Sequence, residues 1–151
     1  MDELTAQLVR LIDIRLLDPL EILVDGHGAV DSLRTVVRER ARSWAATMLH
    51  GDDAAARAVI VRAIATLHPG DGPFQPPVDW WRTPLGQAVA RRMGHPTAEA
   101  VSYAVAGAML GITRQGVHDL AARGKLPRHP EGGVLSAAVR DRLLQEGNRH
   151  A

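Results

Sequence analysis

The spacing of a small-residue pair, a glycine and an aliphatic residue within residues 101–124 constrains the fold more than any other feature. Ala106 and Gly107 are followed by Gly111 and then, six positions further on, by Val117. Two helices can cross steeply only where small side chains let the backbones approach, and glycine readily adopts the left-handed turn between them. The spacing therefore predicts two short helices in a helix-turn-helix arrangement.

The helix signals around this spacing define which side chains face outward. Ser102 and Thr113 can cap the two helices, and Gly124 can end the second. The expected inward residues are Val105, Ala106, Met109 and Leu110 on the first helix and Val117 and Leu120 on the second. Arg and Gln are good donors to guanine and adenine edges in the major groove. The predicted base-reading residues are Thr113, Arg114, Gln115, His118 and Asp119.

A short β-hairpin, or wing, is expected after Gly124. Residues 125–135 read KLPRHPEGGVL, which places Gly132 and Gly133 at the turn. Ser136 can cap a last helix with Val139 and Leu143 inward and with Arg140 and Arg142 outward. The predicted phosphate contacts of this half of the chain are Ser102, Arg123, Lys125, Arg128 and His129.

Residues 101–147 resemble the winged helix-turn-helix of the MerR and excisionase type. The segment LGITRQGVHDLAARGKLP (110–127) carries most of the resemblance, which covers about a third of the chain. In that family an Ala-rich helix, a Gly-aliphatic turn, a helix ending in a Gly-Lys-Leu-Pro-like sequence, a short wing and a closing helix follow in this order. The resemblance implies that Arg114, Gln115 and His118 enter the major groove. It likewise places Lys125, Arg128 and His129 along the phosphates.

The chain departs from the family pattern at three positions and in the wing. Val105 stands where the family often has an acidic residue, and Gly107 stands where it often has Ala. Gly116 lies within the expected recognition helix, at a cost of about 1 kcal/mol relative to Ala. It either permits a close approach of the backbone to DNA or indicates a short helix. The wing is abbreviated as well. These departures leave open a helix-turn-helix that docks a protein rather than DNA.

The charge distribution is asymmetric although the net charge is only +1. Residues 1–79 contain eight Arg and twelve acidic residues, a net charge of −4, whereas residues 80–151 contain ten basic and five acidic residues, a net charge of +5. Such asymmetry is expected when one half meets a polyanion, and chance clustering is the alternative. Lys125 is the only lysine among the 18 basic residues. Arg is therefore the general preference of this chain, and only its placement is informative.

Residues 1–68 are predicted to form a helical module for dimerisation or partner binding. Helices are expected from Asp2 to Ile12, from a restart at Asp18-Pro19, from Asp31 to His50 and from Asp52-Asp53 to His68. The third has an apolar face of Leu33, Val36, Val37, Ala41, Trp44 and Met48. The fourth is apolar nearly all round, so we expect it to be central or covered by a partner.

Polar residues of this module have ordinary explanations. The Asp52-Asp53 pair is interpreted as a helix cap rather than a cation site. Arg34, Arg38 and Arg42 form a basic stripe, in which Asp31 and Glu39 can pair with Arg34 and Arg42. The alternative for the stripe is a further phosphate or acidic-partner contact. His50, His68 and His95 each fall where a helix should end, and a protonated histidine is favoured there by the helix dipole.

Residues 69–82 are predicted to form an ordered connector, followed by a DNA-binding domain at 83–151. The segment 69–84 holds five of the nine prolines and three of the five aromatic residues, Phe74, Trp80 and Trp81. Proline and glycine disfavour a regular element there, and the aromatic rings should anchor the connector to one or both modules. A nucleic-acid stacking platform is the alternative. Thr83 and Pro84 then begin a helix that ends at Gly94.

Composition narrows the functional classes. The 151 residues contain no Cys, which excludes disulfides, zinc-thiolate sites and a cysteine nucleophile, and there is no apolar run long enough to span a membrane. No Gly-rich phosphate loop, nucleophile elbow or metal-ligand spacing is present, so we expect no enzyme activity, cofactor or metal. The sequence predicts a mostly helical, cytoplasmic, nucleoid-associated bacterial protein. It would bind double-stranded DNA sequence-specifically as a homodimer, either as a transcriptional regulator or as a mobile-element accessory factor. The alternative is an adaptor or antitoxin-like interaction module.

Overall fold

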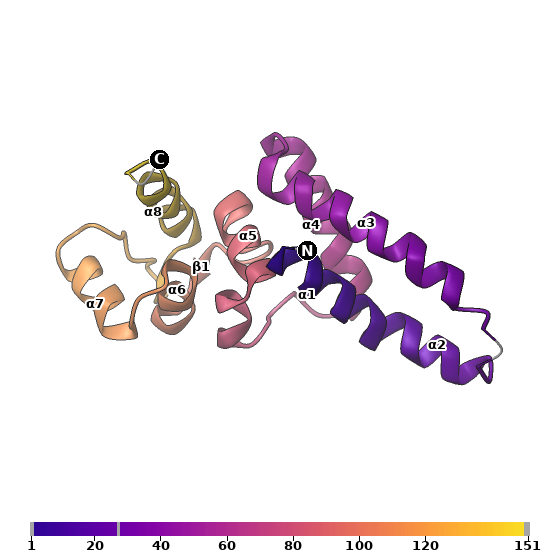
Figure 1. The fold of residues 1–151 in the computed structure, drawn as a ribbon. Helices are drawn as coiled ribbons and strands as arrows, with labels where there is room; N and C mark the ends of the chain where they lie inside the picture. Colours follow the sequence, from indigo (N-terminus) through magenta and orange to yellow (C-terminus); the bar gives the residue numbers. More distant parts are fainter. Residues whose placement is uncertain (1, 27, 150–151) are drawn as a thin grey trace. The chain divides into compact units, whose positions relative to one another are not determined.

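The computed structural model describes residues 2–26 and 28–149 and is mostly helical (Figure 1). Helices make up 69% of it, with one small sheet of two antiparallel strands, which confirms the predicted fold class. The chain divides into two compact units, Met1–Gly70 and Asp71–Ala151. In the described residues no helix combines the length and the apolar character needed to cross a bilayer.

The first unit is built from helices that pack side by side. Its elements are α1 (Glu3–Ile12), the π-helical turn η1 (Asp13–Leu17), α2 (Asp18–Leu23), α3 (Asp31–His50) and α4 (Asp53–Leu67). Helix α3 contacts both α1 and α4 (Figure 1). The fully buried residues of this unit include Leu8, Val30, Ala41, Met48, Ile60 and Leu67. As predicted, Asp2 and Asp52 cap α1 and α4, accepting hydrogen bonds from Thr5 N–H and Ala55 N–H at 2.7 Å each.

The first helix does not stop at Asp18-Pro19, contrary to the prediction. The Asp18 N–H bonds to the carbonyl of Asp13, five residues back, so a π-turn carries α1 directly into α2. Pro19 follows this π-turn in the first turn of α2 and has no N–H to donate there. Asp18 is consequently not a capping residue, and its carboxylate is available for another contact.

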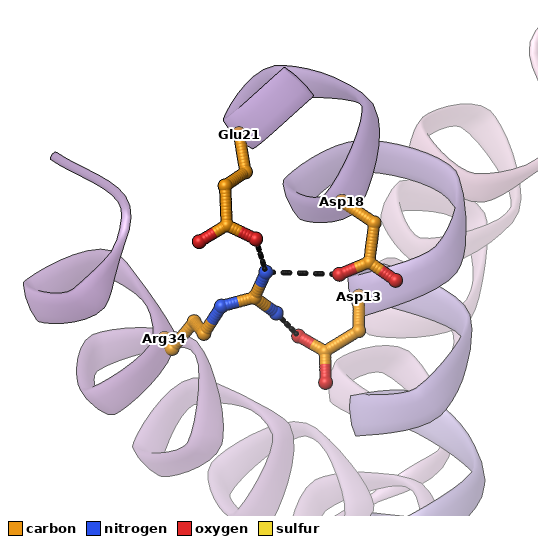
Figure 2. A network of polar contacts seen from close by, with 4 residues as sticks. All are labelled: Asp13, Asp18, Glu21 and Arg34. Atoms are coloured by element: carbon orange, nitrogen blue, oxygen red, sulfur yellow. Dashed lines mark hydrogen bonds and ion pairs between the residues drawn. The ribbon is translucent and has the colours of Figure 1, made fainter. Parts of the chain in front are cut away.

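That contact is made by Arg34, which joins the α1–α2 rod to α3 (Figure 2). One guanidinium nitrogen lies 2.9 Å from Asp13, and the other lies 2.9 Å from Asp18 and 3.2 Å from Glu21. The helical spacing had predicted that Arg34 pairs with Asp31. Arg34 pairs instead with three carboxylates from the preceding elements. A planar guanidinium with several donors can serve more than one carboxylate at once, which a local i, i+3 pair does not require.

Burial in α3 and α4 also differs from the predicted faces. Helix α3 buries Ala41, Ala45 and Met48, whereas Leu33 and Val36 near its start are exposed. Helix α4 buries one face only and leaves Val61 exposed, so it is not central in this unit, and cover by a partner stays a prediction. The buried residues of α3 share one face and lie in its second half, where they are spaced by three and four positions. Apolar surface is thus left on the outside of the first unit.

The second unit has a core that includes the aromatic segment. Its elements are the 3₁₀ helix η2 (Val78–Arg82), α5 (Pro84–Met93), β1 (Ala100–Val101), α6 (Tyr103–Leu110), α7 (Arg114–Ala122), β2 (Val134–Leu135) and α8 (Ser136–Arg149). Trp81 is fully buried, and its ring lies 4.9 Å from that of Trp80. The Gln87 amide donates to the carbonyls of Trp81, Ala108 and Met109 at 2.7–3.1 Å. A short regular element thus forms where Pro and Gly were expected to prevent one.

The small sheet joins the start of the helix-turn-helix to the end of the wing. Strands β1 and β2 pair antiparallel, with Ala100 opposite Leu135 and Val101 opposite Val134. The expected hairpin is reduced to a single bridge between Arg128 and Val134, because Pro127 in its first arm has no N–H to donate. The turn itself lies where the sequence placed it, with positive φ angles at Gly132 and Gly133.

Two histidines at helix ends are half-buried, and their surroundings favour the neutral form over the cationic one. Burial lowers the pKa of His95, and burial together with the charge of Arg15 lowers the pKa of His68. The His95 Nδ1 atom accepts hydrogen bonds from the N–H groups of Thr97 and Ala98 at 3.1 and 2.9 Å, which requires an unprotonated nitrogen. The cationic form that was expected to interact with the helix dipole is therefore disfavoured at both positions.

The His95 environment predicts an acid-sensitive second unit. Unfolding returns the pKa of His95 to its ordinary value of about 6.5. The full contribution of neutral His95 to the free energy of unfolding is therefore present above about pH 6.5. This stability is lost as the pH falls through the lower pKa of the folded state. Urea denaturation should show that His95→Asn loses less stability than the wild type between pH 7.5 and pH 5. Equal losses would contradict the assignment, and His68 is the internal control because it is present in both proteins.

Candidate nucleic-acid interface

The α6–α7 crossing depends on the absence of a side chain at Gly107. A Cβ atom at this position would lie 2.9 Å from the Ile112 carbonyl oxygen and 3.3 Å from the Thr113 carbonyl carbon. The Ile112 N–H bonds to the Gly107 carbonyl at 2.9 Å. Gly111 ends α6 in the left-handed conformation, with φ 72° and ψ 27°. The close approach of the two backbones and the left-handed turn expected from the spacing are both present.

Caps and core contacts then fix the direction of α7. The Ser102 and Thr113 hydroxyl oxygens accept from Val105 N–H and Gly116 N–H at 3.1 and 3.0 Å, so both predicted caps are formed. Val117 is fully buried on the inner face of α7. Because one face of α7 is held inward, the opposite face must point to solvent. Each capping hydroxyl keeps its own hydrogen for a further acceptor.

The outward face of α7 carries four of the predicted base-reading residues, Arg114, Gln115, His118 and Asp119, and Thr113 precedes them; all five are exposed. Arg114, Gln115 and His118 line one open hollow of about 480 Å³. The Gln115 amide nitrogen donates to the Asp119 carboxylate at 3.1 Å, one helical turn further on. Asp119 is therefore engaged in orienting Gln115, while Thr113 lies at the helix start as the cap.

Tyr103 completes the hollow and was not singled out by the sequence. It is the first residue of α6, and its ring centroid lies 5.8 Å from that of His118. Tyr103 and His118 are fifteen positions apart, so no helical periodicity relates them. The available signal was the chain's only tyrosine, next to the capping Ser102 at the start of a helix that is otherwise small and aliphatic.

Gly116 does not shorten the recognition helix, since α7 extends from Arg114 to Ala122. A Cβ atom at Gly116 would lie 3.4 Å from the Ile112 and Thr113 side chains, an ordinary van der Waals distance. The fold therefore does not require glycine at this position. Of the two explanations offered for it, the helix is short, at nine residues, but does not break at Gly116, and close approach to a ligand stays a prediction.

The predicted phosphate contacts fall into two groups. Ser102, Arg123, Lys125 and Arg128 are exposed. His129 is mostly buried instead, with one ring nitrogen accepting from Glu131 N–H at 3.1 Å and the other 3.6 Å from the Glu99 carboxylate. One ring nitrogen of His129 thus has a partner in the wing and the other faces Glu99, just before β1, so its predicted contact to a phosphate is the one that the geometry favours least.

The arginines of α8 are less free than the sequence suggested. Arg140 is half-buried and donates from Nε to the Arg92 carbonyl at 3.0 Å, near the end of α5. The last carbonyls of a helix lack intrahelical partners, which explains why an arginine is drawn there. Arg142 lies 3.5 Å from Glu146 on its own helix. The prediction that Arg140 points outward is therefore wrong.

Residues 2–26 and 28–149 contain no cluster of side chains suited to a metal ion. No three carboxylate or histidine side chains in this part of the chain come together in a way that could hold an ion. The three carboxylates in Figure 2 surround the Arg34 guanidinium, which occupies the space between them.

The two glycines of the helix-turn-helix should respond oppositely to alanine. Gly107→Ala places a methyl group against the Ile112 carbonyl and should lower the free energy of unfolding by about 1–3 kcal/mol. Gly116→Ala meets no obstacle and should raise it by about 1 kcal/mol through helix propensity. Urea denaturation of both variants checks this pair. A stable Gly107→Ala variant would show that the helices cross elsewhere.

Comparison with known proteins assigns no family. No protein-family model matches the chain, and no match was found among curated proteins or solved structures. What the second unit binds must therefore be argued from its geometry and charge.

Proposed function

We propose that the protein binds double-stranded DNA sequence-specifically, with α7 in the major groove and the wing along the phosphates. The observation that carries this proposal is the α6–α7 crossing, which turns Arg114, Gln115 and His118 outward on one helix face. An α-helix fits the major groove of B-DNA, and these side-chain types match base edges there. The proposal includes the MerR and excisionase type of winged helix-turn-helix and a role as transcriptional regulator or mobile-element accessory factor.

Charge supports the same orientation. With the observed boundary, the second unit has ten basic and seven acidic residues, a net charge of +3, whereas the first unit has eight basic and ten acidic residues, a net charge of −2. Exposed basic side chains follow the end of α7 at Arg123, Lys125 and Arg128. Contacts to phosphates from such residues would fix the register of α7 without reading sequence.

Each outward side chain can be given a role by its geometry. Arg114 at the start of α7 can donate two parallel hydrogen bonds to the O6 and N7 atoms of guanine. Gln115, held by Asp119, keeps its amide oxygen and one amide hydrogen for the N6 and N7 positions of adenine. The hydroxyl hydrogens of Ser102 and Thr113 remain available to phosphate oxygens.

The first unit is proposed to form a homodimer through its exposed aliphatic side chains. Ile22 and Leu23 at the end of α2 are 82% and 81% exposed, and Leu33 and Val36 at the start of α3 are exposed as well. These side chains lie on either side of the loop between α2 and α3, and exposed aliphatic groups gathered in this way are typical of protein interaction sites. A second copy would also supply a second recognition helix, as paired half-sites require. An adaptor or antitoxin-like role, with another protein on this surface, is the second candidate.

Base-reading and phosphate-contacting arginines should be separable by experiment. Arg114→Ala should cost about 1–3 kcal/mol of binding free energy on the preferred duplex and relax preference at one base pair. Arg128→Ala should weaken all duplexes alike and reduce the salt slope by about 1, because one phosphate contact is lost. Selection from a random duplex pool at two salt concentrations measures both effects.

The matched control for these variants is Arg57→Ala, which removes the same charge from the exposed side of α4. It should leave both the preferred sequence and the salt slope unchanged. If the wild type shows no salt-dependent binding to any duplex in the pool, the proposed function is wrong.

Dimerisation can be tested at the end of α2. Leu23→Glu should shift the protein from dimer to monomer in sedimentation velocity, because a buried charge without a partner opposes association. Thr66→Glu, at an exposed position of α4, should leave the dimer intact. The wild type should also select two half-sites about 10 base pairs apart. A monomeric wild type would contradict the homodimer and favour the second candidate function, in which another protein binds the aliphatic surface.

A further inference from the structure

The hollow beside α7 has a composition that does not suit a phosphate group alone. It is lined by Tyr103, Arg114, Gln115 and His118, and more of its accessible wall is carbon than polar atoms. The Tyr103 and His118 rings form one side of it, with their planes inclined by 59°. Such an inclination leaves no parallel slot for a stacked base, but it exposes ring surface to a small apolar group.

The polar part of the hollow, the Gln115 amide, indicates which base is read there. Gln115 donates one amide hydrogen to Asp119 at 3.1 Å, which fixes the amide so that its oxygen and second hydrogen remain free. One acceptor beside one donor matches the N6 and N7 groups of adenine. Wherever adenine is read in duplex DNA, thymine is in the same base pair, and thymine carries the only methyl group in the major groove.

We propose that the hollow receives the 5-methyl group of the thymine paired with the adenine that Gln115 reads, and that Tyr103 is a specificity-determining residue. The methyl group lies against the Tyr103 and His118 rings, and its transfer from water to ring surface favours thymine over cytosine at that position. This inference rests on the proposed function, because it requires α7 to enter the major groove.

The decisive experiment deletes the methyl group alone. In the duplex selected by the wild-type protein, each thymine of a half-site is replaced in turn by deoxyuridine, which keeps every hydrogen-bonding group. At one position the wild type should bind about fourfold more weakly, the effect of one apolar carbon removed from a contact. Fluorescence anisotropy at fixed salt concentration measures the two affinities.

Two variants separate the ring from the hydroxyl group. Tyr103→Ala should bind the thymine and deoxyuridine duplexes equally, because the surface that contacts the methyl group is gone. Tyr103→Phe keeps the ring and should retain the wild-type ratio of the two affinities. If Tyr103→Phe loses as much affinity as Tyr103→Ala, the hydroxyl contacts a phosphate and the inference is overturned.

The outcomes distinguish this inference from the proposed function. Absence of binding to any duplex defeats the proposed function. Tight binding in which deoxyuridine is tolerated at every thymine, or a selected half-site without thymine, overturns the methyl contact and leaves DNA binding intact. If Tyr103→Ala fails to fold, His118→Ala on the exposed face of α7 takes its place and should reduce the same ratio.

Discussion

The contact between the Gly107 backbone and the α6–α7 turn is the constraint on which the candidate interface depends. A Cβ atom at this position would lie only 2.9 Å from the Ile112 carbonyl oxygen, so the angle between the helices is set by backbone contact rather than by adjustable side chains. Buried Val117 then fixes the rotation of α7 about its axis. Every outward side chain of α7, and the approach of Tyr103 to His118, follows from these two restraints.

Support for this arrangement comes from the segment that the sequence presented as a connector. Trp81 is buried within the second unit, and the Gln87 amide ties its carbonyl to two carbonyls at the end of α6. Neutral His95 orders the following loop through two backbone N–H groups. The aromatic residues thus belong to the core that holds the recognition helix. Pro and Gly composition indicated an irregular path there but carried no information about what it packs against.

The first unit is organised by a different interaction, the Arg34 guanidinium among three carboxylates (Figure 2). It holds the α1–α2 rod to the start of α3 by polar contacts, and Leu33 and Val36 in the same part of α3 lie outside the core. The exposed aliphatic surface is the physical basis for assigning partner binding to this unit. Helical periodicity identified the apolar residues of α3 but not the side on which its neighbours lie.

The sequence by itself determined the features that act within about one helical turn. Caps at Asp2, Asp52, Ser102 and Thr113, the left-handed Gly111 and the small residue at the helix crossing were all predictable. Only the tertiary structure decided which distant groups meet, as with Tyr103 and His118, Arg140 and the Arg92 carbonyl, or Glu99 and His129. The reason is that capping and turn formation are energies of adjacent residues, whereas these contacts depend on crossing angles that the whole core sets.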